Sequence, residues 1–256
     1  MELNQFFVSV IIPVYNGEKF LAEAIENVQQ QGHYPLEIIV VDDGSTDGTA
    51  DIAAQFKDEI RYVYQSNKGP AVARNLGITL ASGNVIAFLD TDDLWSNDKL
   101  KLQLTYLAEH PSVEIVQGSI QQMQLSTWTR EGKAIFKEVH SPYSYINIGS
   151  AIYRKLVFDK VGLFDETMSY GEDVDWFFRA WENGVSKVVL DQVNLYYRKH
   201  QANMTSGKNL VEVGFVRIFK KHLDRCRKNG KLAATLSPSM LSISEYIGMP
   251  PESYKV

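Results

Sequence analysis

A cluster of carboxylates, Asp90, Asp92 and Asp93, follows the apolar run at residues 85–89. Carboxylates two positions apart, at the point where a strand turns, can converge on one hard divalent cation. Mg²⁺ or Mn²⁺ held in this way keeps several waters and completes its shell with substrate phosphates. Acidic pairs also occur in plain turns, so a turn without a metal is the alternative. The strand that precedes the cluster favours the metal site.

A second acidic group, Asp42 and Asp43, follows the β-branched run at residues 37–41. An acidic residue at the end of a second parallel strand can accept hydrogen bonds from a ribose or a base. We therefore predict nucleotide contact for Asp42 and Asp43. Asp47, four residues further on, is interpreted as a turn or cap residue.

Arg74 lies in the first two turns of a helix that Gly69 and Pro70 are predicted to begin. An arginine at the sheet edge can bind a base or a phosphate with two parallel hydrogen bonds. Its alternative role is that of an ion-pair partner for the surplus carboxylates.

A third acidic group, Glu172, Asp173 and Asp175, stands where another helix is predicted to begin. Acids at a helix N-terminus are favoured by the helix dipole, which is one explanation. The other is chemical, because mutual repulsion and partial burial can raise one pKa into a working range for proton transfer. Asp175 and Arg179 are spaced as an i,i+4 pair, which supports the helix.

Arg198 and His200 come after the last predicted strand. Both are candidate site residues by type and position. A solvated histidine at a strand exit is the alternative for His200.

An alternation of strand and helix patterns must position these groups. Strands are predicted at residues 8–12, 37–41, 61–65 and 84–89, and helices at residues 18–31 and 69–81, with a shorter helix capped by Ser45 or Thr46. This order predicts an α/β fold with a mostly parallel sheet and helices on both faces. Ligands of such sheets bind outside the carboxyl ends of the strands. Five carboxylates would gather there, and they need a cation or hydrogen-bond donors to offset their repulsion.

The second half of the chain is less regular. The predicted elements are a helix at 97–109, a strand at 115–125, an unpatterned loop at 126–145, a strand at 150–153, a helix at 172–182, a strand at 187–197 and a basic tail helix at 209–228. The tail helix has an apolar stripe, which is expected to pack on the domain or on a second subunit: Leu210, Val213, Val216, Phe219 and Leu223. We predict one domain over residues 1–256, with a nucleotide-sugar half at 1–110, an acceptor half at 111–205 and a helical tail at 206–256.

Six ordered elements resemble glycosyltransferase family 2, a group of inverting enzymes with the GT-A fold. They span residues 8 to about 200, and they are Val10-Ile-Ile-Pro-Val-Tyr-Asn16, Val41-Asp-Asp-Gly-Ser-Thr-Asp47, Gly69-Pro-Ala-Val-Ala-Arg-Asn75, Phe88-Leu-Asp-Thr-Asp-Asp93, Val161-Gly-Leu-Phe-Asp-Glu166 and Gly171-Glu-Asp-Val-Asp175. The resemblance implies a GT-A fold and a UDP- or dTDP-sugar donor bound by the first four elements, which include Pro13 and Tyr15.

The resemblance also assigns roles to individual carboxylates. It implies that Asp92 is the chief ligand of Mn²⁺ or Mg²⁺ and that Asp90 lies near both the ribose and the metal. It implies that Asp173 is the catalytic base, with Glu172 beside it. In some GT-A enzymes a residue of the region that corresponds to Arg198 and His200 reaches the diphosphate or the metal, so the resemblance makes both candidates for such contact and His200 a further candidate metal ligand.

Motifs that the sequence lacks reduce the number of reaction classes to consider. No Gln-x-x-Arg-Trp element, typical of processive polysaccharide synthases, occurs in the second half, so addition of a single sugar is expected. A sugar-1-phosphate nucleotidyltransferase is the alternative reaction, but it needs a glycine-rich basic loop after the first strand. A dinucleotide dehydrogenase is disfavoured because no G-x-G-x-x-G follows that strand. A catalytically inactive nucleotide-sugar binder or scaffold is the alternative from another class.

Composition limits the partners. The 256 residues are 45% apolar and 22% charged, and the net charge of -5 argues against nucleic-acid binding. The single cysteine, Cys226, excludes an intrachain disulfide and a cysteine-rich metal site. No apolar stretch reaches the roughly 18–20 residues of a spanning helix, and the run at residues 6–14 is interpreted as a strand rather than a signal peptide. A cytoplasmic protein with a saccharide or lipid-linked acceptor is expected. The tail helix is the candidate for a peripheral membrane contact or for a homodimer interface.

Overall fold

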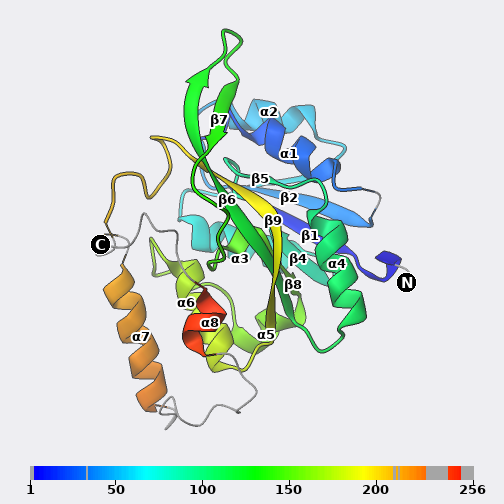
Figure 1. Ribbon diagram of the computed structural model, residues 1–256. Coiled ribbons are helices and arrows are strands. Elements are labelled where there is room, and N and C mark those ends of the chain that lie inside the picture. Colours follow the sequence, from blue (N-terminus) through cyan, green and yellow to red (C-terminus); the bar gives the residue numbers. More distant parts are fainter. Residues whose placement is uncertain (1–2, 33, 210–211, 213, 229–241, 249–256) are drawn as a thin grey trace.

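The computed structural model describes residues 3–32, 34–209, 212, 214–228 and 242–248 (Figure 1). The described residues form one nine-stranded sheet in the order β3-β2-β1-β4-β8-β6-β9-β5, with β7 paired to β6. The strands are β1 Val8–Val14, β2 Leu36–Asp42, β3 Arg61–Tyr64, β4 Val85–Phe88, β5 Leu94–Trp95, β6 Ile115–Trp128, β7 Ala134–Glu138, β8 Ala151–Arg154 and β9 Lys187–Lys199. The helices are α1 Leu21–Gln29, α2 Thr49–Gln55, α3 Pro70–Leu80, α4 Lys99–Glu109, α5 Leu156–Val161, α6 Glu172–Glu182, α7 Phe215–Lys228 and α8 Ile243–Ile247, with short 3-10 turns at Leu3–Gln5 and Ile148–Ser150.

The parallel part of the sheet is the block β3-β2-β1-β4. Its register places Val14 opposite Asp42 and Asp42 opposite Tyr64, so the carboxyl ends of β1, β2 and β3 lie side by side. The remaining strands are mixed. β8 runs antiparallel to both β4 and β6, and β5 runs antiparallel to β9, whereas β6 and β9 are parallel. The predicted α/β architecture and its parallel block are confirmed.

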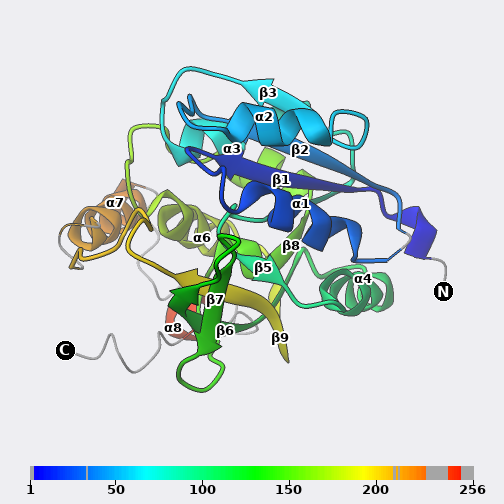
Figure 2. The same ribbon diagram turned by 90° about the horizontal axis from the view of Figure 1, so that it is seen from above.

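The core lies on both faces of this sheet because successive strand residues point to opposite sides. Val10 of β1 packs in one cluster with residues of α1 and α4, while the adjacent Ile11 packs in another with residues of α3, α5 and α6. In Figure 2, α7 lies beside α6 on the opposite side of the molecule from α4. The predicted helices on both faces are therefore confirmed.

The predicted helix cap at Ser45 or Thr46 is wrong. The helix α2 begins at Thr49 with Gly48 as its cap residue. The Ser45 hydroxyl instead accepts the Asn16 backbone N–H at 2.8 Å, and the Thr46 N–H donates to the Asn16 side chain at 2.8 Å. Ser45 and Thr46 therefore bond to Asn16 in the loop after β1, and these bonds link the end of β1 to the end of β2.

The predicted loop at 126–145 is also wrong in part, because it contains a β-hairpin. The strand β6 continues to Trp128, the chain turns at Thr129, and β7 returns antiparallel to β6. In Figure 1 the hairpin rises above the rest of the sheet. The short elements β5, α5 and α8 were also not predicted.

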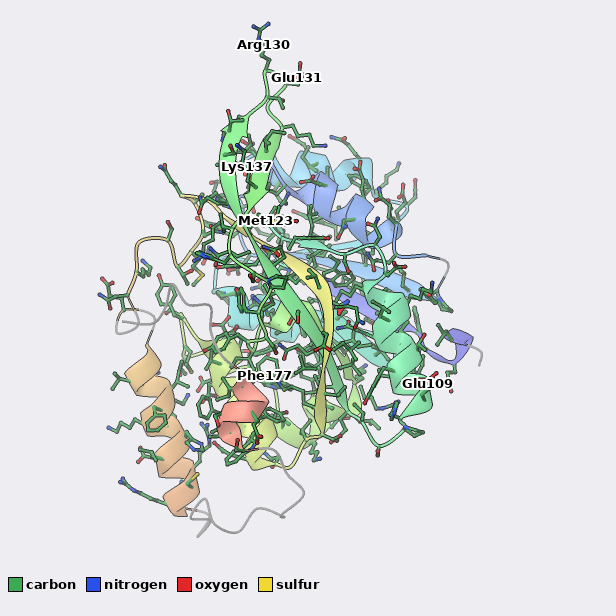
Figure 3. All side chains as sticks on the ribbon, viewed as in Figure 1. Glu109, Met123, Arg130, Glu131, Lys137 and Phe177 are labelled. Atoms are coloured by element: carbon green, nitrogen blue, oxygen red, sulfur yellow. The ribbon has the colours of Figure 1, made fainter. Side chains whose placement is uncertain are left out.

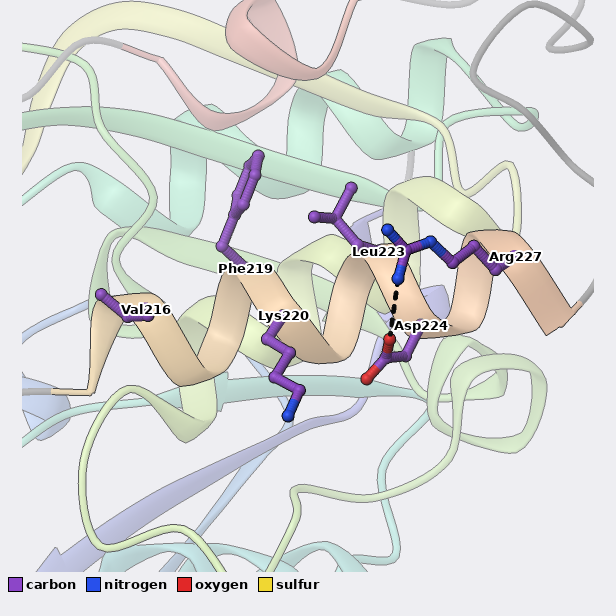
Figure 4. Close-up of a pocket in the computed structure, with 6 residues that line it drawn as sticks. All are labelled: Val216, Phe219, Lys220, Leu223, Asp224 and Arg227. Atoms are coloured by element: carbon purple, nitrogen blue, oxygen red, sulfur yellow. Dashed lines mark ion pairs between the residues drawn. The ribbon is translucent and has the colours of Figure 1, made fainter.

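Of the two alternatives predicted for the apolar stripe of the tail helix, packing on the domain is wrong for its described residues, and pairing with a second subunit stays a prediction. Ile218 and His222 are the buried residues of α7, whereas Val216, Phe219 and Leu223 are 65%, 47% and 39% exposed. The apolar stripe forms an outer groove together with Lys220, Asp224 and Arg227 (Figure 4). Leu210 and Val213 lie outside the described residues.

Charge explains the orientation of α7. Glu182 of α6 bonds to His222 at 2.6 Å and to Arg225 at 2.7 Å, and Asp175 of α6 bonds to Arg225 at 2.8 Å. The basic side of α7 therefore faces the acids of α6. Among the described helices, none combines the length and the hydropathy that a membrane-spanning segment needs.

Candidate active site

The Arg74 side chain links two acidic segments that are far apart in sequence. Its Nη2 atom donates to Asp90 Oδ1 at 2.8 Å, just after β4, and its Nη1 atom bonds to the Glu172 carboxylate at the start of α6. Burial opposes the charge on Arg74, but Asp90, Glu172 and Asp173 together outweigh it and raise the pKa of the guanidinium. Arg74 is therefore the ion-pair partner of the surplus carboxylates, which was one of its two predicted roles.

The acid pair at the start of α6 follows Gly171, whose φ of 69° is accessible to glycine at little cost. Burial raises the pKa of Glu172 to about 7 against the opposing pull of Arg74, with Asp173 adding to the rise. Burial also raises the pKa of Asp173, against Arg74 and with a contribution from Asp90. The half-buried Asp173 carboxylate accepts the Val174 backbone N–H at 2.8 Å. This first turn of α6 therefore holds two carboxylates that are stronger bases than ordinary ones.

Asp175 has a different environment. Its Oδ2 atom accepts from Arg179 Nε at 3.0 Å, as the i,i+4 spacing predicts. Arg179 also donates to the backbone oxygens of Val161 at 2.9 Å and Leu163 at 2.7 Å. The pair therefore fastens the chain before α6 to the helix itself.

Asp92 lies at a second group of contacts, formed by the segment after β9. Its Oδ2 atom accepts from Asn203 Nδ2 at 2.7 Å and lies 3.0 Å from His200 Nε2. The Asn203 side chain also accepts the His200 backbone N–H, so it fixes the histidine and the carboxylate together. The structure thus brings His200 to Asp92, from 108 residues away in sequence.

Asp93 and Arg198 form the buried floor of this group. The Arg198 backbone N–H donates to Asp93 Oδ1 at 2.8 Å, and its guanidinium bonds to the Asp92 carbonyl oxygen and to the Glu23 carboxylate. Burial raises the pKa of Asp93 well above its usual range, with Asp92 and Asp90 adding to the effect and Arg198 opposing it. Asp93 and Arg198 therefore hold the acidic turn in place from beneath.

The carboxylates of Asp42 and Asp43 are occupied by internal hydrogen bonds. Asp42 accepts from the Ser45 N–H at 2.8 Å and from the Tyr62 hydroxyl. Asp43 accepts three donors, namely the Gln65 side chain at 2.7 Å and the backbone N–H groups of residues 68 and 69, each at 2.8 Å. Both residues order the loops around the carboxyl ends of β2 and β3.

Two exposed aromatic rings stand at the same edge. Tyr15 follows β1 and Tyr64 ends β3, and both are more than half exposed. Pro13 contributes its carbonyl oxygen, which accepts the Thr91 hydroxyl at 2.8 Å and so joins the end of β1 to the acidic turn after β4. Tyr64 was not among the predicted site residues.

The carboxylates of Asp92 and Asp90 offer the oxygen ligands that a hard divalent cation prefers. Among the described residues, no three His, Cys, Asp or Glu side chains are grouped so that they could hold a metal ion by themselves. Mg²⁺ sites that serve phosphate transfer usually use one or two carboxylates, with waters and substrate phosphates as the other ligands. Asp92 fits this kind of site, because its carboxylate is half-buried and contacts His200, and because a second carboxylate, Asp90, lies two positions before it.

Asn203 and Glu23 are the contacts of this group that sequence reasoning missed. Asn203 lies in an exposed polar loop after β9, and Glu23 lies in the first turn of α1. Neither residue belongs to a motif or a periodic pattern, so no local signal identifies them. Only the tertiary packing brings Asn203 to Asp92 and Glu23 to Arg198.

Comparisons with known proteins agree with this architecture. The family model described as glycosyl transferase family 2 matches residues 9–162. The chain belongs to glycosyltransferase family 2. Its fold is also that of TarS of S. aureus, a structure solved as residues 1-349 in complex with UDP-GlcNAc. The TM-score is 0.68 at 23% identity, over 90% of this chain and 68% of that chain. The GT-A fold is therefore confirmed.

Relatives with higher identity are known by sequence. An "Uncharacterized glycosyltransferase" of Rickettsia felis is 37% identical over 232 residues, which are 84% of this chain and 37% of the relative. The "Putative teichuronic acid biosynthesis glycosyltransferase TuaG" of Bacillus subtilis is 39% identical over 141 residues, 54% of each protein. The chain therefore spans little more than a third of the first relative and about half of the second.

Proposed function

We propose that this chain is an inverting glycosyltransferase that moves one sugar from a UDP- or dTDP-sugar to an acceptor hydroxyl, with Mn²⁺ or Mg²⁺ bound. The observation that carries the proposal is the bridge that Arg74 forms between Asp90 and Glu172. This bridge joins the strand end with the candidate metal ligands to the helix start with the candidate base, Asp173. A donor bound at the strand ends would then have a carboxylate on its acceptor side.

Asp173 is the general base in this proposal. Its carboxylate takes the proton of the acceptor hydroxyl while the hydroxyl oxygen forms a bond to the anomeric carbon. The bond from that carbon to the diphosphate oxygen breaks on the opposite face, and its electron pair leaves with the nucleotide diphosphate. A single displacement inverts the anomeric centre. The raised pKa of Asp173, caused by burial against the pull of Arg74, makes its carboxylate a better proton acceptor.

Asp92 is the main candidate ligand for the cation, with Asp90 and His200 as further candidates. When bound, a divalent cation would neutralise negative charge that develops on the departing diphosphate. Asn203 and His200 orient Asp92 through its Oδ2 atom. Arg74 keeps Asp90 fixed and offsets part of the acidic charge at this edge.

The nucleotide would lie across the ends of β1, β2 and β3. Tyr15 and Tyr64 offer exposed rings there for stacking with the base, and Asp42 and Asp43 order the loops around it. The TarS structures that contain UDP-GlcNAc and UDP support a UDP-sugar as the donor class. The name of TuaG supports a role in saccharide polymer or glycoconjugate assembly.

The proposal also covers the domain organisation, the binding partners and the cellular location. Residues 1–110 would bind the donor and residues 111–205 the acceptor, with 206–256 as a helical tail. The outer groove of α7 is the candidate surface for an anionic membrane or a second copy of the chain, in a cytoplasmic protein. Flotation with anionic vesicles and sedimentation of the free protein distinguish these two partners.

Metal-dependent binding of UDP tests the proposal. UDP affinity is measured by calorimetry with and without Mn²⁺, for the wild type, for Asp92→Ala and for the control Asp98→Ala, an exposed acid nearby. Asp92→Ala should lose roughly tenfold or more of the affinity in Mn²⁺, and little without it. Equal losses under both conditions would contradict the assignment of Asp92.

Transfer itself is tested by UDP release from a panel of nucleotide sugars with Mn²⁺ and candidate acceptors. Hydrolysis or transfer of one donor is the expected result. Tight binding of UDP without release from any donor would instead favour the inactive nucleotide-sugar binder.

A further inference from the structure

The hairpin of β6 and β7, residues 115–138, has contacts that reach the candidate metal ligand. At its base, β6 pairs with β9 on one side and β7 on the other, so that Met123 lies opposite both Arg198 and Glu138. Figure 3 shows Met123 at the base of the hairpin, and Arg130 and Glu131 at the tip, pointing away from the body. The base of the hairpin is therefore part of the sheet, whereas its tip is free of it.

The Arg198 guanidinium lies between two aromatic rings. Its Cζ atom is 5.1 Å from the ring centre of Phe20, which precedes α1, and 5.0 Å from that of Phe136, which belongs to β7. Cations over ring faces are attracted by the ring quadrupole, and more strongly where water is excluded. Arg198 is buried, and its Nη2 atom has no hydrogen-bond partner among the described residues. The two rings thus take the place of part of the solvent around a buried charge.

The same guanidinium holds the acidic turn. Its Nε atom donates to the Asp92 carbonyl oxygen, while the Arg198 backbone N–H donates to Asp93. A displacement of the guanidinium would release the Asp92 carbonyl and would weaken the hold on Asp93. The position of the Asp92 carboxylate therefore depends on what keeps Arg198 in place.

Trp128, also on the hairpin, makes a second contact. Its ring centre is 6.0 Å from that of Phe20, and the Phe20 ring is 5.0 Å from the imidazole of His200. Lys19 Nζ lies 5.2 Å from the Trp128 ring. The hairpin thus reaches two of the three side chains of β9 and the following segment that contact Asp92. It contacts Arg198 directly and His200 through Phe20.

We propose that the β6–β7 hairpin is a positioning element for Asp92, and that it acts mainly through Phe136 on Arg198. Phe136 and Arg198 are positioning residues, since neither needs to touch the donor. Where it concerns donor binding, this inference rests on the proposed function. Its direct consequence, a more mobile acidic turn when the Phe136 ring is removed, does not.

The neighbouring residue on β7 supplies a matched control. Ile135 and Phe136 point to opposite faces of the strand, and Ile135 is 38% exposed. Ile135→Ala removes apolar atoms from the same strand without touching Arg198. Phe136→Leu keeps most of the volume but has no ring, and it serves as the second variant if Phe136→Ala does not fold.

Hydrogen exchange of the free protein is the first measurement. Phe136→Ala should speed exchange of the backbone amides of residues 90–95 and of Arg198 by roughly fivefold, and Ile135→Ala should leave them unchanged. Phe136→Tyr, which restores a ring, should restore wild-type exchange. Unchanged exchange in both Phe136→Ala and Phe136→Leu, or equal acceleration by Ile135→Ala, would overturn the proposal.

UDP affinity with and without Mn²⁺ is the second measurement. Phe136→Ala should reduce the gain in affinity that Mn²⁺ gives, and Ile135→Ala should keep it. Faster exchange with an unaltered Mn²⁺ gain would overturn the role in donor binding. Faster exchange in a protein whose wild type binds no UDP would support the positioning of Asp92 and refute the proposed function instead.

Discussion

The helix α6 carries two aspartates that are two positions apart and have opposite environments. Asp175 is 1% exposed, and its two oxygens are bound by Arg179 at 3.0 Å and Arg225 at 2.8 Å. Asp173 is half-buried, accepts only a backbone N–H among the bonds the structure describes, and has a raised pKa. The side of α6 that faces α7 is neutralised, whereas the turn that faces Arg74 retains excess negative charge.

This difference separates a carboxylate held in ion pairs from the carboxylate that we propose as the base. The ion pairs of a buried carboxylate with two arginine partners are costly to break, because the arginine charges would be left without a partner. A carboxylate whose burial is only partly offset is held at an energetic cost and binds a proton more readily. The contrast makes Asp173, and not Asp175, the candidate base.

The largest expected effect is on the chemistry at Asp173. Asp173→Asn removes the proton acceptor and keeps the shape of the side chain. Transfer should fall by roughly 100-fold to 10,000-fold, which is the usual contribution of a positioned base. UDP affinity should stay within a few fold of the wild type, and the melting temperature should not fall. Initial rates of transfer, calorimetry with UDP and thermal unfolding are the measurements; near-wild-type turnover would show that the base is another residue.

Features with a local sequence signal could be predicted, and features that depend on long-range contacts could not. The parallel strands and the acidic groups at their ends were predictable because continuous β-branched runs and the residues that follow them are local signals. The β6–β7 hairpin was not, because most of Ala134–Glu138 is exposed and, within the described part of the chain, this strand pairs with β6 alone. Helical periodicity located the apolar stripe of α7, but the acids of α6, 40–50 residues away, decide which side of α7 faces the protein.

Most residues of the candidate site could be predicted from the sequence, but the contacts between them could not. Spacing alone left two roles open for Arg74, and only the structure joins it to Asp90 and Glu172. His200 was a candidate on its own, whereas Asn203, which binds both His200 and Asp92, has no pattern around it. Contacts of this kind depend on how β9 packs on the acidic turn, and one sequence does not encode that locally.

The next effect, on stability, is expected at Asp175. Asp175→Asn leaves Arg179 and Arg225 without their shared carboxylate, and it should lower the free energy of unfolding by about 2–4 kcal/mol. Folded molecules should keep transfer rates within a few fold of the wild type. Urea unfolding and initial rates below the transition measure both effects. Since the substitution is the same as in Asp173→Asn, each variant is the control of the other, and matching losses in both would remove the distinction between the two sides of α6.

The last effect is the pH response of the first turn of α6, in which activity and stability should move in opposite directions. Asp173 must be ionised to accept a proton, so transfer should decline as the pH falls through its raised pKa. Glu172 has a pKa of about 7 in the folded protein and an ordinary value of 4.5, so the folded state binds its proton more tightly. Its contribution to stability is complete below pH 4.5 and is lost as the pH rises to about 7.

Urea unfolding and transfer rates at a series of pH values from 4.5 to 7 measure the two responses. Glu172→Gln cannot titrate, so the decline of stability over this interval should be smaller in that variant than in the wild type. If both proteins show the same decline, Glu172 is not the group that titrates. If the wild type instead gains stability across the interval relative to Glu172→Gln, then Arg74 outweighs burial at Glu172, and the excess negative charge assigned to this turn is neutralised just as it is at Asp175.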